Sequence, residues 1–192
     1  RARGVEHLTR CIDIAASLGC SFLSGSFHSV FGLKAAGPVG LEPWRRSADC
    51  LRTVARHAAS CGMDIALEPI NRYESFLVNT GSQARELIRM IGEPNVKVQL
   101  DTFHMNIEEE DPVRAIEEAG QSRVHFHGAE NHRGRFGTGT IDWDAIFAAL
   151  ARIAYRGAIV IESFVPEVAE VAAAACIWRA MNTQKPMISS SG

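Results

Sequence analysis

Four residues that could share one chemical task each stand at the end of a short apolar segment. Glu68 ends DIALE, Asp101 ends KVQLD, His127 lies near the end of RVHFHG and Glu162 ends AIVIE. Three carboxylates and one imidazole could converge on a single divalent ion. Oxygen ligands suit Mg or Mn, and the imidazole shifts the preference towards Mn, Co or Zn. Carboxylates can also take up and return protons as general bases and acids.

Structural interpretations compete with this one, although Glu162, which ends the apolar run AIVI, is the hardest of the four to explain in that way. Glu68 could end a strand in solvent, Asp101 with Thr102 could cap a turn, and His127 could be a hydrogen-bonded core histidine. No local spacing ties position 68 to position 162. The metal hypothesis therefore depends on elements that bring the four segment ends together.

Predicted helices and strands alternate along the chain. Strands are expected at residues 20–25, 64–68, 97–101, 123–128 and 158–162. Helices are expected at residues 3–18, 43–62, 80–91, 112–119 and 143–153, followed by a final Ala-rich helix. Alternation of this kind implies parallel strands joined by right-handed crossovers. An open doubly wound sheet and a closed barrel both satisfy it.

The polar residues favour the barrel. Three consecutive strands have one apolar face and one face with polar or ionisable groups, which include Asp64, Glu68, Lys97, Gln99, Asp101, His125 and His127. Central strands of an open sheet covered by helices are apolar on both faces. We therefore predict an α/β fold, a (β/α)8 TIM barrel, whose active site forms at the C-terminal strand ends. His125 lies one layer deeper than His127 and is expected to be a core or supporting histidine.

Long motifs around these strand ends resemble a known enzyme family. They are ALEPINRYE (66–74), LDTFHMNIEEED (100–111), VHFHGAENHRGRFGTGTIDW (124–143) and IVIESF (159–164). They are similar to the ketose 3-epimerase family, which includes the D-tagatose, D-psicose and L-ribulose 3-epimerases, among the xylose-isomerase-like barrels. The resemblance extends from Leu18 to about Arg179.

The resemblance implies an activity and a set of site residues. The activity is metal-dependent inversion of carbon 3 of free ketoses (D-tagatose, D-psicose/D-fructose or L-ribulose) through an enediolate. The implied metal ligands are Glu68, Asp101, His127 and Glu162. Glu68 and Glu162 would also be the catalytic acid–base pair, and the substrate's carbonyl end would be held by Glu74, His104 and Arg133. Mn or Co is the favoured ion, and Mg and Zn stay open.

Other functions of the same barrel compete with this interpretation. Hydroxypyruvate isomerase-like and inosose dehydratase-like enzymes share the ligand set, but the NRYE and ENHR contexts favour a free ketose. An endonuclease IV-like nuclease would need several more histidine ligands and a basic groove, and the sequence supplies neither. A metal-binding but inactive barrel fragment is a further alternative.

The length bears on that last alternative. The 192 residues are expected to form one domain, residues 1–192, with an ordinary globular composition of 46% hydrophobic and 22% charged residues. A TIM barrel usually takes about 250 residues and eight strands. Because only five strands are predicted, we expect a partial barrel that lacks the first three βα units and belongs to a longer chain.

Composition also limits the partners. A formal net charge of -2 predicts no nucleic acid or anionic membrane partner. The longest apolar run, residues 171–178, is far below the roughly 20 residues of a membrane span. Five cysteines without a C-x-x-C motif, none at zinc-finger spacing from a histidine, predict buried thiols in a reducing cytoplasm. The expected partner is a small ketose, and the oligomeric state stays open, although the family commonly forms dimers or tetramers.

Overall fold

The computed structural model of the chain describes residues 2–120, 123–164 and 168–177. Its strands are β1 (Phe22–Gly25), β2 (Asp64–Leu67), β3 (Val96–Asp101), β4 (Arg123–Gly128) and β5 (Ile159–Ile161). Its helices are α1 (Ala2–Ser17), α2 (Leu41–Ser60), α3 (Gly81–Ile91), α4 (Thr102–Glu108), α5 (Pro112–Ala119), α6 (Trp143–Arg152) and α7 (Ala169–Ala174). The part of the predicted Ala-rich helix beyond residue 177 lies outside the described residues.

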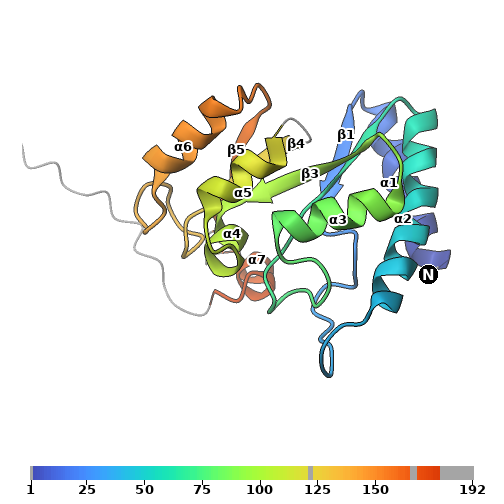
Figure 1. Cartoon of the computed structure of the whole chain (residues 1–192), viewed down its shortest axis with the longest axis horizontal. Coiled ribbons are helices and arrows are strands. Elements are labelled where there is room, and N and C mark those ends of the chain that lie inside the picture. The colour runs from blue at the N-terminus through green and yellow to red at the C-terminus, as the bar shows by residue number, and fades with distance from the viewer. Residues whose placement is uncertain (1, 121–122, 165–167, 178–192) are drawn as a thin grey trace, which may run out of the picture.

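The five strands form one parallel sheet in the order β1-β2-β3-β4-β5 (Figure 1). A doubly wound sheet would reverse its strand order at a switch point, whereas a barrel adds each strand beside the one before it. The unbroken order therefore confirms the predicted (β/α)8 architecture, of which five consecutive strands are described. Among the described residues, β1 and β5 each pair with a single strand.

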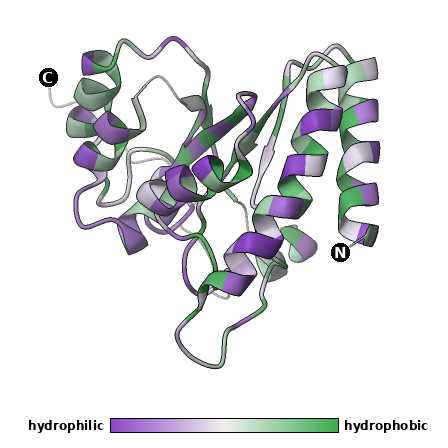
Figure 2. Cartoon of the chain, turned by 45° about the vertical axis from the view of Figure 1, so that its right-hand side comes forward, coloured by the Kyte–Doolittle hydropathy of each residue, from purple (hydrophilic) through white to green (hydrophobic). Residues whose placement is uncertain are grey.

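The hydrophobic core lies between the outer face of the sheet and the helices. The outward residues of the central strands are 0–1% exposed, and they are Ile65, Leu67, Val98, Leu100 and Phe126. They belong to one cluster with apolar residues of α2, α3, α5 and α6. Burial of each large apolar side chain stabilises the fold by roughly 1.5–3 kcal/mol. Figure 2 shows the matching pattern on the helices, whose surfaces divide into hydrophobic and hydrophilic sides.

The inner face of the sheet is polar, as the alternation predicts. Gln99, Asp101 and His125 are all buried there, at 0%, 1% and 8% exposure. The His125 ring meets the His127 ring edge-on with centroids 4.9 Å apart, and it also contacts Phe22. His125 thus has the buried supporting position expected from the sequence.

Side-chain caps fix where several helices begin. Thr80 and Gln83 form a capping box at the start of α3. Asp111 accepts a hydrogen bond from the Arg114 amide at the start of α5, and Asp142 does the same at α6. Each such cap contributes about 1 kcal/mol. All three helix starts agree with the sequence prediction.

Two expectations need correction. The cysteines are not buried thiols: Cys20 and Cys176 are exposed, and Cys11, Cys50 and Cys61 are partly buried. Helix α2 begins at Leu41, before the predicted start at Pro43, because a proline is tolerated in the first turn, where amides have no intrahelical partner. Within the described ranges, no helix is both long and apolar enough to cross a membrane.

Candidate active site

The four predicted metal ligands lie together at one edge of the sheet. Glu68 follows β2, Asp101 ends β3, His127 lies near the end of β4 and Glu162 follows β5. Parallel strands direct all four to the same edge. The Nδ1 atom of His127 is 3.6 Å from Glu68 Oε1, 3.7 Å from Asp101 Oδ2 and 3.8 Å from Glu162 Oε1. One imidazole nitrogen is therefore surrounded by three carboxylates.

The close carboxylates perturb each other's protonation. Burial alone would lower the pKa of His127, but Asp101 and Glu68 raise it to about 10. Burial and the neighbouring Asp101 raise the pKa of Glu162 to about 7. Burial also opposes charge on Asp101, yet His127, His104 and Arg133 outweigh it and lower the pKa of Asp101. The cluster concentrates negative charge in a poorly solvated place.

This donor set fits a divalent cation. Asp101 Oδ1 accepts the Phe103 amide at 2.6 Å, whereas Asp101 Oδ2 is buried without a hydrogen-bond partner. A buried carboxylate oxygen whose nearest donor, His127 Nδ1, is 3.7 Å away is incompletely satisfied, and a coordinated ion would remove that cost. Ligand atoms of Asp101, His127 and Glu162 lie within 4.8 Å of one another. Three oxygens and one imidazole are ligands that Mn or Co accepts.

Two hydrogen-bond donors converge beside these ligands. His104 Nδ1 accepts the Asn71 amide at 3.1 Å, so the proton of the neutral ring lies on Nε2. Burial lowers the pKa of His104, which favours this neutral form. One terminal nitrogen of Arg133 is 3.1 Å from that Nε2, and the other donates to Glu162 at 3.1 Å. In this tautomer two donors face each other at 3.1 Å without a hydrogen bond between them, a contact that an oxygen atom accepting from both would relieve.

Aromatic rings and the backbone hold Arg133 in place. Its guanidinium carbon lies 4.0 Å from the centre of the Phe103 ring and 5.0 Å from that of Phe164. Such cation–π contacts are worth about 0.5–2 kcal/mol each. Arg133 itself has a φ of 55°, in the left-handed region that a non-glycine residue adopts at a cost of roughly 1–3 kcal/mol. The surrounding contacts must offset that cost.

A cavity of about 420 Å³ opens among these groups. Five of the seven predicted site residues line it, namely Glu68, Glu74, His104, Arg133 and Glu162. The other two, Asp101 and His127, do not line it, but His127 Nδ1 lies 3.6 Å from Glu68 and 3.8 Å from Glu162. Phe31, Ile70 and Phe164 add apolar walls. The volume is in the range of small-molecule sites.

Several supporting residues were missed by the sequence prediction. Asn71 fixes the His104 ring, Gln99 lies 3.1 Å from His127 Nδ1, and Glu130 anchors the loop that carries Arg133. Asn71 and Glu130 lie in the family motifs and Gln99 lies in the strand segment KVQLD, but nothing local distinguishes the three from other polar residues. His28, which bonds to the Glu68 carbonyl oxygen at 3.0 Å, lies in a loop without any recognised motif.

Known proteins match the chain along most of its length. A family profile described as xylose isomerase-like TIM barrel matches residues 1–181. An L-ribulose 3-epimerase of Methylomonas sp. (strain DH-1) is 38% identical over 180 residues, which are 93% of this chain and 63% of that protein. A 3-dehydro-D-guloside 4-epimerase of Escherichia coli (strain K12) is 37% identical over 167 residues, 84% of this chain and 64% of that protein.

The solved structures agree with the sequence matches. The structure of an L-ribulose 3-epimerase superposes with a TM-score of 0.90 at 40% identity, covering 95% of this chain and 62% of that one. The chain thus spans a little under two thirds of the length of these relatives. The profile match, the strand order and the sequence identities agree, and the chain belongs to the xylose isomerase-like TIM barrel family.

Proposed function

We propose that the strand-end site belongs to an epimerase that inverts carbon 3 of free ketoses. The main support is that Glu68 and Glu162, from the ends of β2 and β5, line one cavity together with the donors His104 and Arg133. The relatives named as L-ribulose and D-psicose 3-epimerases support the same choice of reaction.

The two glutamates would move the proton. One carboxylate removes the proton from carbon 3, which leaves an enediolate, and the other returns a proton to the opposite face of the same carbon. In the reverse reaction their roles are exchanged. Because one proton is removed and one is returned, the substrate is neither oxidised nor reduced.

A divalent ion, Mn or Co by preference, would be held by Glu68, Asp101, His127 and Glu162. Bound there, it would polarise the ketone and stabilise the negative charge of the enediolate. The unpartnered Asp101 Oδ2 and the three carboxylates around His127 support this assignment.

The remaining residues would orient the sugar. Arg133 and the Nε2–H of His104 would donate to the oxygen on which charge develops, and such donors act most strongly in a water-poor site. Glu74, on the cavity wall, would accept a hydrogen bond from a hydroxyl near the carbonyl end. These side chains would recognise a small polyhydroxy ketone.

The test is isotope exchange in D2O with Mn or Co added after chelation. D-Psicose, D-tagatose and L-ribulose should each be assayed by NMR, and deuterium is expected at carbon 3 together with the C3 epimer. Glu68→Gln and Glu162→Gln should abolish exchange while circular dichroism shows the fold retained. Glu117→Gln, at an exposed ion pair on α5, is the matched control.

The possible results separate the alternatives. Full exchange in both glutamine variants would overturn the two-glutamate mechanism. Deuterium at carbon 4 instead of carbon 3 would replace the proposed reaction with that of a 4-epimerase. Activity unaffected by prolonged chelation would overturn the assignment of the ion.

A further inference from the structure

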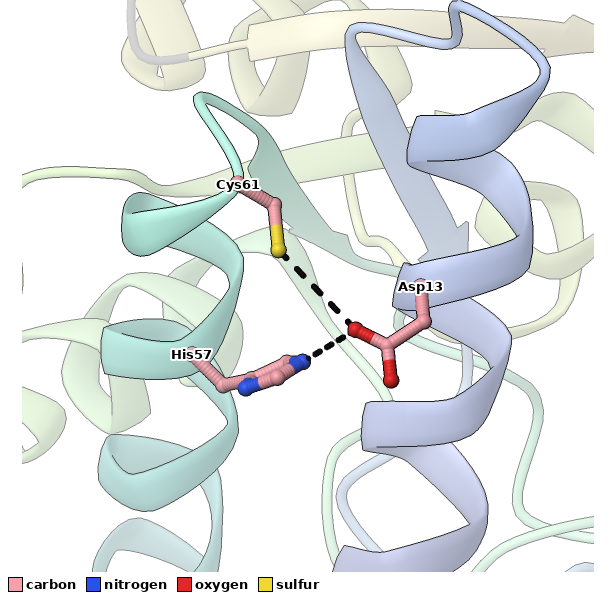
Figure 3. A group of neighbouring side chains, drawn as sticks. All are labelled: Asp13, His57 and Cys61. Carbon is pink, nitrogen blue, oxygen red and sulfur yellow. Dashed lines mark hydrogen bonds and ion pairs between the residues drawn. The ribbon is translucent and has the colours of Figure 1, made fainter.

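A second group of potential metal ligands lies between two outer helices. Asp13 is on the last turns of α1, His57 is in the last turn of α2, and Cys61 caps that helix. Figure 3 shows the three side chains pointing towards one another across the gap between the helices. Each of these helices leads into the start of the following strand. The group therefore lies at the opposite end of the sheet from the candidate active site.

The three ligand atoms are close enough to share one ion. His57 Nε2 is 2.7 Å from Asp13 Oδ1, and Cys61 Sγ is 4.0 Å from the same oxygen. All three ligand atoms lie within 4.8 Å of one another. Tetrahedral zinc, with bonds of 2.0–2.3 Å, holds its ligand atoms about 3.3–3.6 Å apart. Small side-chain rotations would therefore bring the group to that geometry.

The local structure favours a cation. His57 and Cys61 are four residues apart and lie on one face of α2, the spacing by which helices present paired ligands. The C-terminal end of a helix carries partial negative charge, which attracts a positive ion. The Asp13 side chain is 58% exposed and that of His57 33%, so an ion can enter and water can complete its coordination.

Two other uses of the same residues fit less well. A cysteine nucleophile would need the imidazole between the carboxylate and the thiol, but here Asp13 lies between His57 and Cys61. A simple ion pair would explain the contact of Asp13 with His57 but not the thiol directed at the same oxygen.

We propose that Asp13, His57 and Cys61 form a zinc site that ties α1 to α2. The site is independent of the proposed epimerase chemistry and would act on stability. An ion that binds the folded chain better than the unfolded chain raises the midpoint of thermal unfolding. Zinc binds the thiolate and the neutral imidazole, so its affinity should increase with pH.

Cobalt distinguishes this site from the strand-end site. A thiolate bound to Co²⁺ gives an intense charge-transfer absorption in the near ultraviolet, and the strand-end ligands are only oxygens and imidazole. Titration of the whole chain with Co²⁺ should produce this band, and added Zn²⁺ should remove it. Cys61→Ser should abolish the band.

Cys11→Ser is the matched control. His7 and Cys11 on α1 have the same four-residue spacing and a 3.7 Å contact, but they belong to no three-ligand group in the described part of the chain. The control should keep both the band and the gain in unfolding midpoint with Zn²⁺.

Asp13→Asn covers the case in which Cys61→Ser fails to fold. It keeps the thiol but loses a charged ligand, and cobalt affinity should fall at least about tenfold, the lower end of what loss of even an outer partner costs. Absence of the band from the parent chain would overturn the proposal. So would a band that survives Cys61→Ser or is lost in Cys11→Ser.

Discussion

Asp101 caps a helix and in addition keeps one carboxylate oxygen in the position that its proposed role as a metal ligand requires. Its Oδ1 accepts amides of Phe103 and His104 and so caps α4, while its Oδ2 faces the His127 imidazole at 3.7 Å. The cap fixes the orientation of the carboxylate. Because one oxygen is held by the backbone, the other is available as a ligand without a further loss of rotamer freedom.

His28 is a buried histidine in a loop, and it makes stability depend on pH. Burial lowers the pKa of His28 to about 4, against an ordinary value of 6.5, and its Nδ1 is buried without a hydrogen-bond partner. The unfolded chain therefore binds a proton that the folded chain rejects between these two values. Neutral His28 therefore contributes to the free energy of unfolding in full above pH 6.5. This contribution, about 3 kcal/mol, is lost as the pH falls towards 4.

We expect His28→Gln to remove this pH dependence. The difference in the free energy of unfolding between the parent chain and the variant should change by about 2–3 kcal/mol between pH 7.5 and 4.5. Urea unfolding at several pH values measures it. His132→Gln, in the loop after β4, serves as control. The prediction would be contradicted if the free energy of unfolding changed with pH to the same extent in the parent chain and in His28→Gln.

At the scale of elements, the loop from β4 to α6 is organised around Glu130. This carboxylate is 1% exposed and accepts the Gly137 amide at 2.6 Å and the Trp143 indole N–H at 2.8 Å. The Arg133 amide bonds to the Glu130 carbonyl oxygen. Gly139 passes so close that a Cβ there would collide with the Glu130 carboxylate. One side chain thus sets the path of the segment that presents Arg133.

Glu130→Ala should therefore affect catalysis more than metal binding. Two partly solvated donors, the Gly137 amide and the Trp143 indole N–H, lose their acceptor, at a cost of about 0.5–1.5 kcal/mol each in the free energy of unfolding. We expect a lower kcat for the proposed epimerisation with unchanged Mn affinity, because the proposed ligands lie at or directly after strand ends and not in this loop. Glu130→Gln, which keeps an acceptor oxygen, should recover part of the activity.

The outcome that would contradict this role is equal loss of metal affinity and kcat in Glu130→Ala. Glu117→Ala, at an exposed glutamate on α5, controls for removal of a carboxylate. Isothermal titration with Mn and steady-state kinetics on the same preparations supply both readouts.

The elements were predictable to a greater extent than the loops. Strand and helix positions follow from alternation, capping residues and helix periodicity, all of which are local. Helix α4 was missed because its cap is also the last residue of β3. The conformation at Arg133 was missed because its positive φ depends on Phe103, Phe164 and Glu130, which local patterns cannot connect to it.

The convergence of the candidate site residues was predictable where they end strands. The motif resemblance supplied Glu74, His104 and Arg133, which the strand pattern alone did not. The Asp13–His57–Cys61 group was not found from the sequence. Asp13 and His57 are 44 residues apart, and they are brought together only when α1 packs on α2.

At the scale of the whole molecule, the two outer strands of the sheet differ from the inner three. Among the described residues, β5 pairs only with β4, and Ile159, Val160 and Ile161 are 38–49% exposed. Unpaired backbone groups beside exposed apolar side chains form a surface on which another chain can add a strand.

We expect the isolated 192-residue chain to self-associate through this edge. Ile159→Lys should raise the concentration at which half of the chains are associated at least about tenfold. This corresponds to a loss of about 1.4 kcal/mol in the free energy of association. Ile14→Lys, at an exposed position on α1, is the matched control for reduced surface hydrophobicity. Sedimentation velocity over a concentration series measures both. Equal effects of the two substitutions would exclude a contribution specific to the strand edge.

Strands that are neighbours in the sheet follow one another in the sequence, so the two groups of proposed ligands are completed at different times during synthesis. A chain made from its N-terminus has all of Asp13, His57 and Cys61 once residue 61 has left the ribosome, but it obtains its fourth strand-end ligand only with Glu162. Domains fold as their segments emerge. If zinc binds the first group as proposed, it would assist the nascent chain while α1 and α2 dock. The four proposed ligands of the strand-end ion would be together only after β5 has joined the sheet.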